Sequence, residues 1–255
     1  LVSFLVWHVP NFYEKPSVKN ALLLGAAFGW LTLIRPTNAL VGFYVFLFNV
    51  YSFSELIERF RFWAGQTKLL LLIAAAGIVF WIPQMWYWYE MTGVWFRYSY
   101  TDEGFIYWKN PKIAEVLFDT QNGLFVYTPM AFLMLGDIVF SDIQKRNSAP
   151  ALLLIFVFST YLFASWWAWW FGGAFGARSY IELFALFALP LAGVYTGIFS
   201  LKSQWIKRLA LAGCAFLIYY SVRLSYLYTY LPTPWDGPDW RWNFDKLIWI
   251  WRHLV

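Results

Sequence analysis

Two arginines of this chain stand among residues that would help a guanidinium hold an anion. The first, Arg35, lies in the run LIRPTN, between two apolar stretches. A guanidinium can hold a phosphate or pyrophosphate through two parallel hydrogen bonds. A helix beginning at Pro36 would add the partial positive charge of its N-terminus. The alternative is an arginine that extends to lipid headgroups, and residue type and spacing leave both interpretations open.

The second arginine, Arg178, ends a segment rich in tryptophan and glycine, WWAWWFGGAFGAR. Aromatic faces such as those of Trp169 and Trp170 stack on the apolar faces of sugars and on polyprenyl chains. Glycines such as Gly173 let backbone N–H groups approach an anion with which the guanidinium could pair. An interfacial tryptophan belt followed by a flexible turn explains the tryptophans, but it leaves the glycines before the arginine unexplained.

Four further side chains are candidates for contact with a polar substrate. Glu182 follows Arg178 at a helical offset of four, which predicts an ion pair that orients the arginine. Tyr127, in the run GLFVYTP, would either offer its hydroxyl to a substrate or anchor the chain at a membrane surface. Asp102 and Glu103, in the polar stretch 90–122, are the candidate acid–base groups. Carboxylates in loops are more often simply solvated, so these two are weak candidates.

The residues that bind metals most strongly are scarce in this sequence. Cys214 is the only cysteine, and the two histidines, His8 and His253, lie near opposite ends of the chain. This distribution excludes a disulfide framework and argues against a zinc site. No cofactor is predicted with certainty, although a divalent cation such as Mg²⁺ or Mn²⁺ could still be held by carboxylates.

The composition indicates where these residues work. Of 255 residues, 61% are hydrophobic, 24% are aromatic and only 13% are charged. Soluble domains carry about 25% charged residues, and disordered chains are poor in aromatics, so both classes are excluded. The net charge of +5 is small and does not imply nucleic acid. We therefore expect an all-α integral membrane protein whose partners include membrane lipids.

Apolar runs define the predicted membrane crossings. A crossing needs about 20 apolar residues. Residues 21–51 are interrupted by the arginine and proline of LIRPTN, so we expect a short helical hairpin there, because an unpaired charge at mid-membrane is costly. With the tail of a helix over residues 1–9, we predict about seven to eight membrane segments. The other predicted crossings are Leu69–Trp88, Gly123–Phe140, Ala149–Trp166, Ile181–Ser200 and Leu209 to about Tyr228.

Lysine and arginine are about twice as dense on one predicted side, which the positive-inside rule makes cytoplasmic. The loops 90–122 and 167–180 and the C-terminal tail 222–255 then face outward. Two short amphipathic helices are expected at the interfaces, Ser52–Trp63 inside and Pro111–Phe118 outside. We expect one membrane domain over residues 1–255. Because the sequence begins at Leu1 with the end of an apolar helix, we expect it to be the C-terminal part of a longer chain.

Several of these motifs together resemble the GT-C superfamily of membrane glycosyltransferases, and more narrowly its bacterial, protein-mannosyltransferase-like family 39. The likeness covers roughly residues 19–182. It consists of Lys19 with Gly25 and Gly29 leading into LIRP, then GLFVYTP and WWAWWFGGAFGAR.

The resemblance implies a multi-helical enzyme of the bacterial inner membrane with a large outer cavity. It implies a polyprenyl-phosphate-linked sugar as donor, and a lipid, glycan or protein as acceptor. It also implies a catalytic carboxylate in a first outer loop upstream of Leu1, with Arg35 and Arg178 near the lipid phosphate.

Two other functions stay open. A transporter or flippase for lipid-linked saccharides predicts paired mid-membrane charges and inverted halves, neither of which the sequence displays. A non-catalytic membrane subunit predicts an upstream segment without an acidic outer loop.

Overall fold

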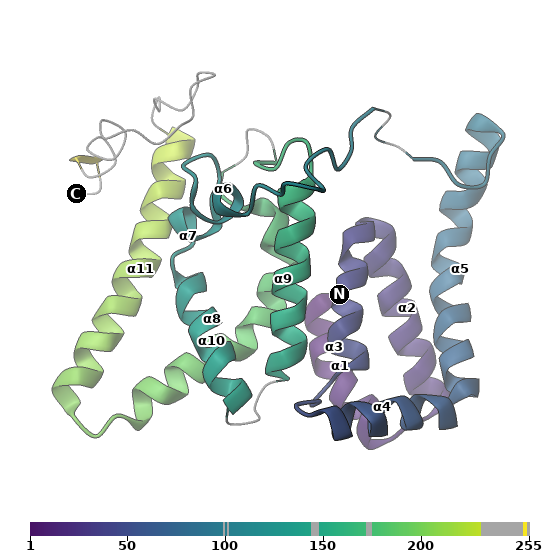
Figure 1. Cartoon of the computed structure of the whole chain (residues 1–255), viewed down its shortest axis with the longest axis horizontal. Coiled ribbons are helices and arrows are strands. Elements are labelled where there is room, and N and C mark those ends of the chain that lie inside the picture. The colour runs from purple at the N-terminus through teal and green to yellow at the C-terminus, as the bar shows by residue number, and fades with distance from the viewer. Residues whose placement is uncertain (99, 101, 144–147, 172–174, 231–251, 254–255) are drawn as a thin grey trace. The chain divides into compact units, whose positions relative to one another are not determined.

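The computed structural model of the chain describes residues 1–98, 100, 102–143, 148–171, 175–230 and 252–253, and in this part the regular elements are all helical (Figure 1). The predicted all-α class is therefore confirmed. Three helices are long and apolar enough to cross a membrane: Thr67–Thr92, Arg178–Ser200 and Gln204–Tyr226. Shorter apolar helices cover Val18–Ile34, Met130–Phe140 and Ala149–Ser165. The chain divides into two compact units, each built from several stretches of sequence.

Unit 1 consists of residues 1–104, 138–159 and 182–187. Its helices are α1 (Val2–Glu14), α2 (Val18–Ile34), the 3₁₀ helix η1 (Pro36–Val41), α3 (Gly42–Phe46), α4 (Phe53–Gly65) and α5 (Thr67–Thr92). Parts of α8 (Met130–Ile143), α9 (Ala149–Ser165) and α10 (Phe184–Ser200), with the end of the 3₁₀ helix η2 (Arg178–Leu183), complete the unit.

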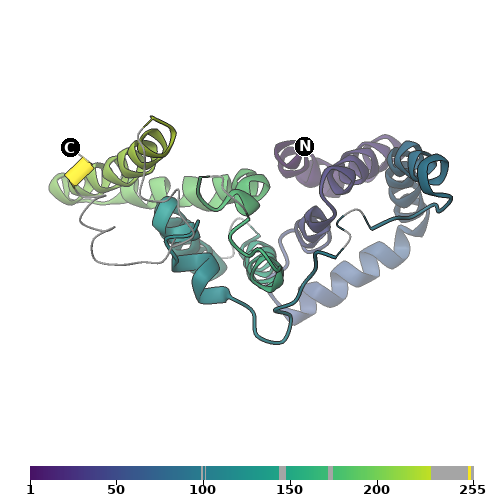
Figure 2. The same cartoon turned by 90° about the horizontal axis from the view of Figure 1, so that it is seen from above.

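Glycines allow α2 to lie directly against α5, as both views show (Figures 1 and 2). A Cβ atom built on Gly29 would lie 2.5 Å from the Cα atom of Gly77, and one on Gly25 would lie 2.8 Å from the Cα atom of Ile73. Because no side chain separates the two backbones, small residues at this spacing produce the close approach that is common between membrane helices.

The predicted break at LIRPTN is present. Helix α2 ends at Ile34, Arg35 has extended backbone (φ −152°, ψ 113°), and Pro36 opens η1. After this break the chain turns back toward α1. The hydroxyl of Tyr13, near the end of α1, donates a hydrogen bond to the carbonyl of Val45 in α3 (2.7 Å). The second arm is shorter than expected, since α3 ends at Phe46 and not near residue 51.

Unit 2 consists of residues 105–137, 160–181 and 188–255. It contains α6 (Ile113–Phe118), α7 (Leu124–Tyr127), most of α8 (Met130–Ile143) and the end of α9 (Ala149–Ser165). It also contains the start of η2 (Arg178–Leu183), most of α10 (Phe184–Ser200), and α11 (Gln204–Tyr230).

Two predicted elements of unit 2 need correction. The expected crossing Gly123–Phe140 is not one helix, because Thr128 is non-helical (φ −134°, ψ 65°) between α7 and α8. Pro129 disfavours helical backbone at the residue before it and has no N–H to donate. The outward tail was predicted to begin at residue 222, but α11 continues to Tyr230. Residues 231–251 and 254–255 of the predicted tail lie outside the described residues.

Candidate functional site

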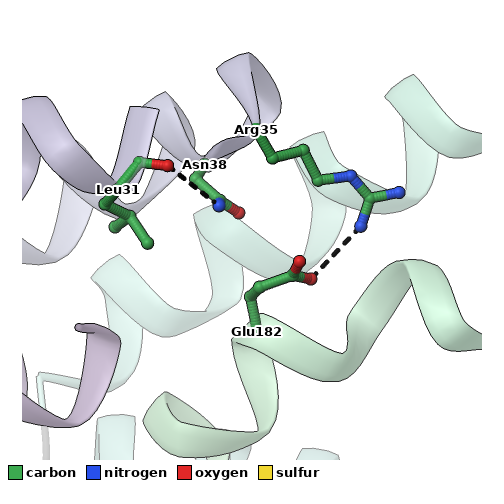
Figure 3. A network of polar contacts seen from close by, with 4 residues as sticks. All are labelled: Leu31, Arg35, Asn38 and Glu182. Carbon is green, nitrogen blue, oxygen red and sulfur yellow. Dashed lines mark hydrogen bonds and ion pairs between the residues drawn. The ribbon is translucent and has the colours of Figure 1, made fainter. Parts of the chain in front are cut away.

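In unit 1, the turn after α2 holds an ion pair between residues far apart in sequence. Arg35 Nη1 lies 3.2 Å from Glu182 Oε2, and the two side chains are 27% and 26% exposed. Figure 3 shows the side chains pointing toward each other, Arg35 from the residue after α2 and Glu182 from the end of the 3₁₀ helix η2 (Arg178–Leu183). The extended backbone of Arg35 directs the guanidinium away from the axis of α2. A positive charge in this half-buried position is thus balanced by a carboxylate.

A buried asparagine stabilises the same turn. Asn38 is 4% exposed, and its Nδ2 donates to the carbonyl of Leu31 at 3.3 Å (Figure 3). This carbonyl lies in the last turn of α2 and also accepts from the backbone N–H of Arg35 at 3.3 Å. The bond from Asn38 fixes η1 against the end of α2 and thereby fixes the backbone that carries Arg35.

The partner of Glu182 differs from the one predicted. We expected an ion pair with Arg178 at an α-helical offset, but Glu182 pairs with Arg35. Arg178 and Glu182 lie in η2, a 3₁₀ helix of about 3.0 residues per turn, in which residues four apart point in different directions. Arg178 is exposed, and within the described part of the chain no ion pair to it is found.

In unit 2, the runs GLFVYTP and WWAWWFGGAFGAR are in direct contact. Asn122 Nδ2 donates to the carbonyl of Trp170 at 2.8 Å. The ring of Tyr127 meets that of Phe175 edge to face, with centroids 5.0 Å apart. Gly176 has φ +67°, and a Cβ atom there would lie 3.3 Å from the Cβ of Tyr127. Glycine at this position satisfies both the left-handed backbone and the close packing.

Asn122 was not among the predicted site residues. Its φ of +67° lies in the left-handed region, which asparagine tolerates better than most residues, and its side chain is almost buried. The Asn-Gly dipeptide at 122–123 is a strong turn signal in sequence and could have identified it.

Tyr127 is buried at 5% exposure, and its hydroxyl donates to the carbonyl of Thr120. The two roles that we predicted, substrate contact and surface anchor, both require an accessible hydroxyl. The observed location suits a residue that holds the loop before α7 in shape.

An aromatic group lies next to this contact. The ring of Trp170 is 5.6 Å from that of Trp169 and 6.1 Å from that of Trp167, both edge to face. Trp169 and Trp170 are half-buried, so each presents part of its ring to the surroundings. Phe171 has φ +55°, an uncommon conformation for a bulky residue, and such strain concentrates at functional sites. Gly173 lies outside the described residues.

The predicted acid–base candidates lie on the surface of unit 1. Asp102 and Glu103 are both exposed in the turn-rich stretch after α5. The Tyr98 hydroxyl donates to the backbone carbonyl of Glu103 at 2.7 Å. This bond involves the backbone of Glu103 and not its carboxylate, and the residue is exposed. Among the described residues, no three His, Cys, Asp or Glu side chains are grouped so that they could hold a metal ion.

Unit 1 also contains an apolar cavity of about 330 Å³ between α2, α3, α4 and α5. Two of its polar lining residues are paired, because Trp81 Nε1 donates to Thr32 Oγ1 at 3.2 Å and Thr32 donates to the carbonyl of Gly29 at 2.9 Å. A third, Trp63, is buried in the lining with no hydrogen-bond partner for its Nε1 among the described residues. Neither Arg35 nor Glu182 lines it. The cavity is therefore separate from the ion pair, and most of its lining is apolar.

No protein-family model matches this chain, and neither the curated proteins nor the solved structures include one that it resembles significantly.

Proposed function

We propose that this chain is part of a membrane glycosyltransferase that moves a sugar from a polyprenyl phosphate to a lipid, glycan or protein acceptor on the outer face of a bacterial inner membrane. The observation that carries the proposal is the contact in unit 2 between Asn122 and the carbonyl of Trp170. This contact fixes a partly exposed aromatic group eight residues before an exposed arginine. A ring surface for a sugar and a guanidinium for a phosphate are what a lipid-linked sugar requires.

The membrane arrangement forms part of the same proposal. In this proposal the chain has about seven to eight membrane segments, which include the three long apolar helices, the three shorter ones and the second arm of the hairpin at Arg35. The lysine- and arginine-rich stretches, such as 201–208 with Lys202, Lys207 and Arg208, face the cytoplasm. The stretches 90–122 and 167–180 then face the periplasm, where lipid-linked sugars would be used.

The proposed reaction is a displacement at the anomeric carbon. The acceptor hydroxyl oxygen bonds to that carbon, the bond between the carbon and the phosphate oxygen breaks, and its electron pair leaves with the lipid phosphate. A carboxylate takes the proton of the acceptor hydroxyl. In our proposal this base is a residue upstream of Leu1, with Asp102 and Glu103 as weaker candidates, and Arg178 stabilises the charge on the departing phosphate.

The test is sugar transfer by the full-length protein in proteoliposomes that contain polyprenyl-phosphate-linked radioactive sugars. Arg178→Ala should lower the transfer rate by roughly 100-fold or more, the usual effect of losing one donor to a developing negative charge. Arg208→Ala is the matched control, because Arg208 is an equally exposed arginine in α11 and takes no part in the proposed site.

Equal transfer rates for Arg178→Ala and the unsubstituted protein would refute the assignment. Absence of transfer with every donor, combined with movement of labelled donor across the bilayer, would favour a flippase. Absence of both would favour a non-catalytic subunit.

A further inference from the structure

Helix α4 has a different orientation from its neighbours in unit 1. It runs crosswise to α5 and crosses the end of α1 (Figure 1). Its N-terminus is capped twice, because Ser52 Oγ accepts from the N–H of Glu55 at 3.3 Å and Glu55 accepts from the N–H of Tyr51 at 2.6 Å. Only Gln66 separates α4 from α5. A short, well-capped helix is therefore fixed at one end of a helix that is long and apolar enough to cross a membrane.

One face of α4 packs on the protein. Trp63 is 7% exposed and stacks on Phe12 of α1 with ring centroids 5.5 Å apart. The Arg59 guanidinium lies 3.8 Å from the ring centre of Tyr13 and donates to the carbonyl of Phe48 at 2.6 Å. This face is therefore covered by the protein itself.

A second face is apolar and uncovered. Phe53 is 77% exposed, Phe60 is 66% exposed and Ile57 is 38% exposed, with Ala64 also exposed one turn later. The spacing of four, three and four residues aligns these side chains in a single stripe along the helix. Burying a Phe or Ile side chain contributes about 1.5–3 kcal/mol, so leaving the stripe in water would be unfavourable.

A third face is polar and exposed, and it lies next to the stripe. It contains Ser54, Glu58 and Arg61. A helix with protein on one side, an apolar stripe on the second and polar groups on the third matches a helix lying at a membrane surface.

Charge and chain connection both favour a lipid surface as the partner. Arg61 on α4 and Lys68 at the start of α5 are exposed. Helix α4 contacts the end of α1. Lys15 directly follows α1, Lys19 lies in the first turn of α2, and both are exposed as well. Basic residues at this level suit the phosphates of anionic lipids. The start of α5, one residue from α4, marks where an apolar crossing segment begins.

We propose that α4 lies in the surface of the membrane, with Phe53, Ile57, Phe60 and Ala64 inserted among the acyl chains and Arg61 and Lys68 at the level of the lipid phosphates. This inference needs the chain to be in a membrane but is independent of glycosyl transfer. A protein that failed every sugar-transfer assay would still be expected to place α4 in this way.

The test uses single-cysteine variants of the full chain, in a Cys214→Ala background, each carrying a spin label. Ile57→Cys and Phe60→Cys report on the stripe, and Ser54→Cys and Glu58→Cys are the matched controls on the polar face of the same helix. All four positions are exposed, so the substitutions leave no internal cavity. The protein is placed in vesicles of phosphatidylcholine and phosphatidylglycerol.

We expect labels at positions 57 and 60 to collide often with oxygen, which concentrates in the bilayer, and rarely with a water-soluble nickel complex. Labels at positions 54 and 58 should show the reverse. Equal access of the nickel complex to all four positions would overturn the proposal. Protection of positions 57 and 60 from both reagents would also overturn it, because a protein and not lipid would then cover the stripe.

Discussion

At the scale of single residues, the Arg35–Glu182 pair shows how a charge is accommodated in an apolar chain. The two groups are 147 residues apart in sequence and 3.2 Å apart in space. Each is about a quarter exposed, so solvent screens the pair only partly. Removing one partner loses this attraction and leaves the other charge half-buried, which costs more than the attraction alone.

This setting predicts a measurable coupling between the two residues. Arg35→Ala and Glu182→Ala should each lower the free energy of unfolding in detergent by about 1 kcal/mol or more, and the double variant should lose clearly less than the sum. The matched control is Lys112–Glu115, an ion pair of similar length (3.3 Å) within one turn and 33% exposed at both ends. Its coupling should be at most about 0.5 kcal/mol. Additive losses at Arg35 and Glu182 would contradict the structure of this turn.

At the scale of helices, the contact between α2 and α5 depends on the absence of side chains. The backbones approach where Gly25 and Gly29 face Ile73 and Gly77. The gain is van der Waals contact along both helices, which is the main source of helix association where water is absent. The sequence marks these glycines only as a spacing of four, and their partners on α5 cannot be recognised from it.

Gly29→Ala is therefore expected to destabilise the protein, although alanine is the better helix former. The added Cβ would lie 2.5 Å from the Cα atom of Gly77, so the helices must separate, at a cost of roughly 1–3 kcal/mol. In the matched control Gly213→Ala, a Cβ on α11 meets nothing within 4 Å, and a neutral or slightly stabilising effect is expected. Thermal unfolding in detergent measures both, and equal midpoints for the two variants would disprove the close contact.

The helices also show what was predictable. The pattern of neighbouring residues was sufficient to predict the long apolar helix around Leu69–Trp88 and the break at Pro36. It also predicted the amphipathic helix that the structure places at Phe53–Gly65. The break before Pro129 follows from the same pattern, but it was not predicted because the residues on both sides of the proline are apolar. The pairing of Glu182 with Arg35 and the bond from Asn122 to Trp170 connect residues 147 and 48 apart. Contacts over such distances depend on the whole fold and have no local signal.

At the scale of the whole molecule, the proposed topology assigns opposite sides of a membrane to the two ends of each crossing helix. Between α10 and α11, the connection 201–203 contains the exposed Lys202 and Ser203, and Lys207 and Arg208 follow in the first turns of α11. The loop before α6 is also exposed and includes Ile106. The positive-inside rule assigns the first to the cytoplasm and the second to the outside.

Labelling of intact cells tests this assignment. In a Cys214→Ala background, Ile106→Cys should react with a membrane-impermeant maleimide added to cells whose outer membrane has been opened. Ser203→Cys should react only after the inner membrane is also permeabilised. Both positions are exposed, so protein burial does not explain a difference between them. Labelling of both cysteines from the outside would exclude the proposed topology.

The discontinuous make-up of unit 1 has a consequence for how the protein is made. Arg35 leaves the ribosome well before its counter-charge at Glu182, which is 147 residues further along the chain. At about 5–20 residues per second, this gap corresponds to roughly 7–30 s of translation. During that interval the carboxylate that pairs with Arg35 in the folded chain has not yet been synthesised. Slow translation would therefore prolong the period in which this turn exists without its ion pair.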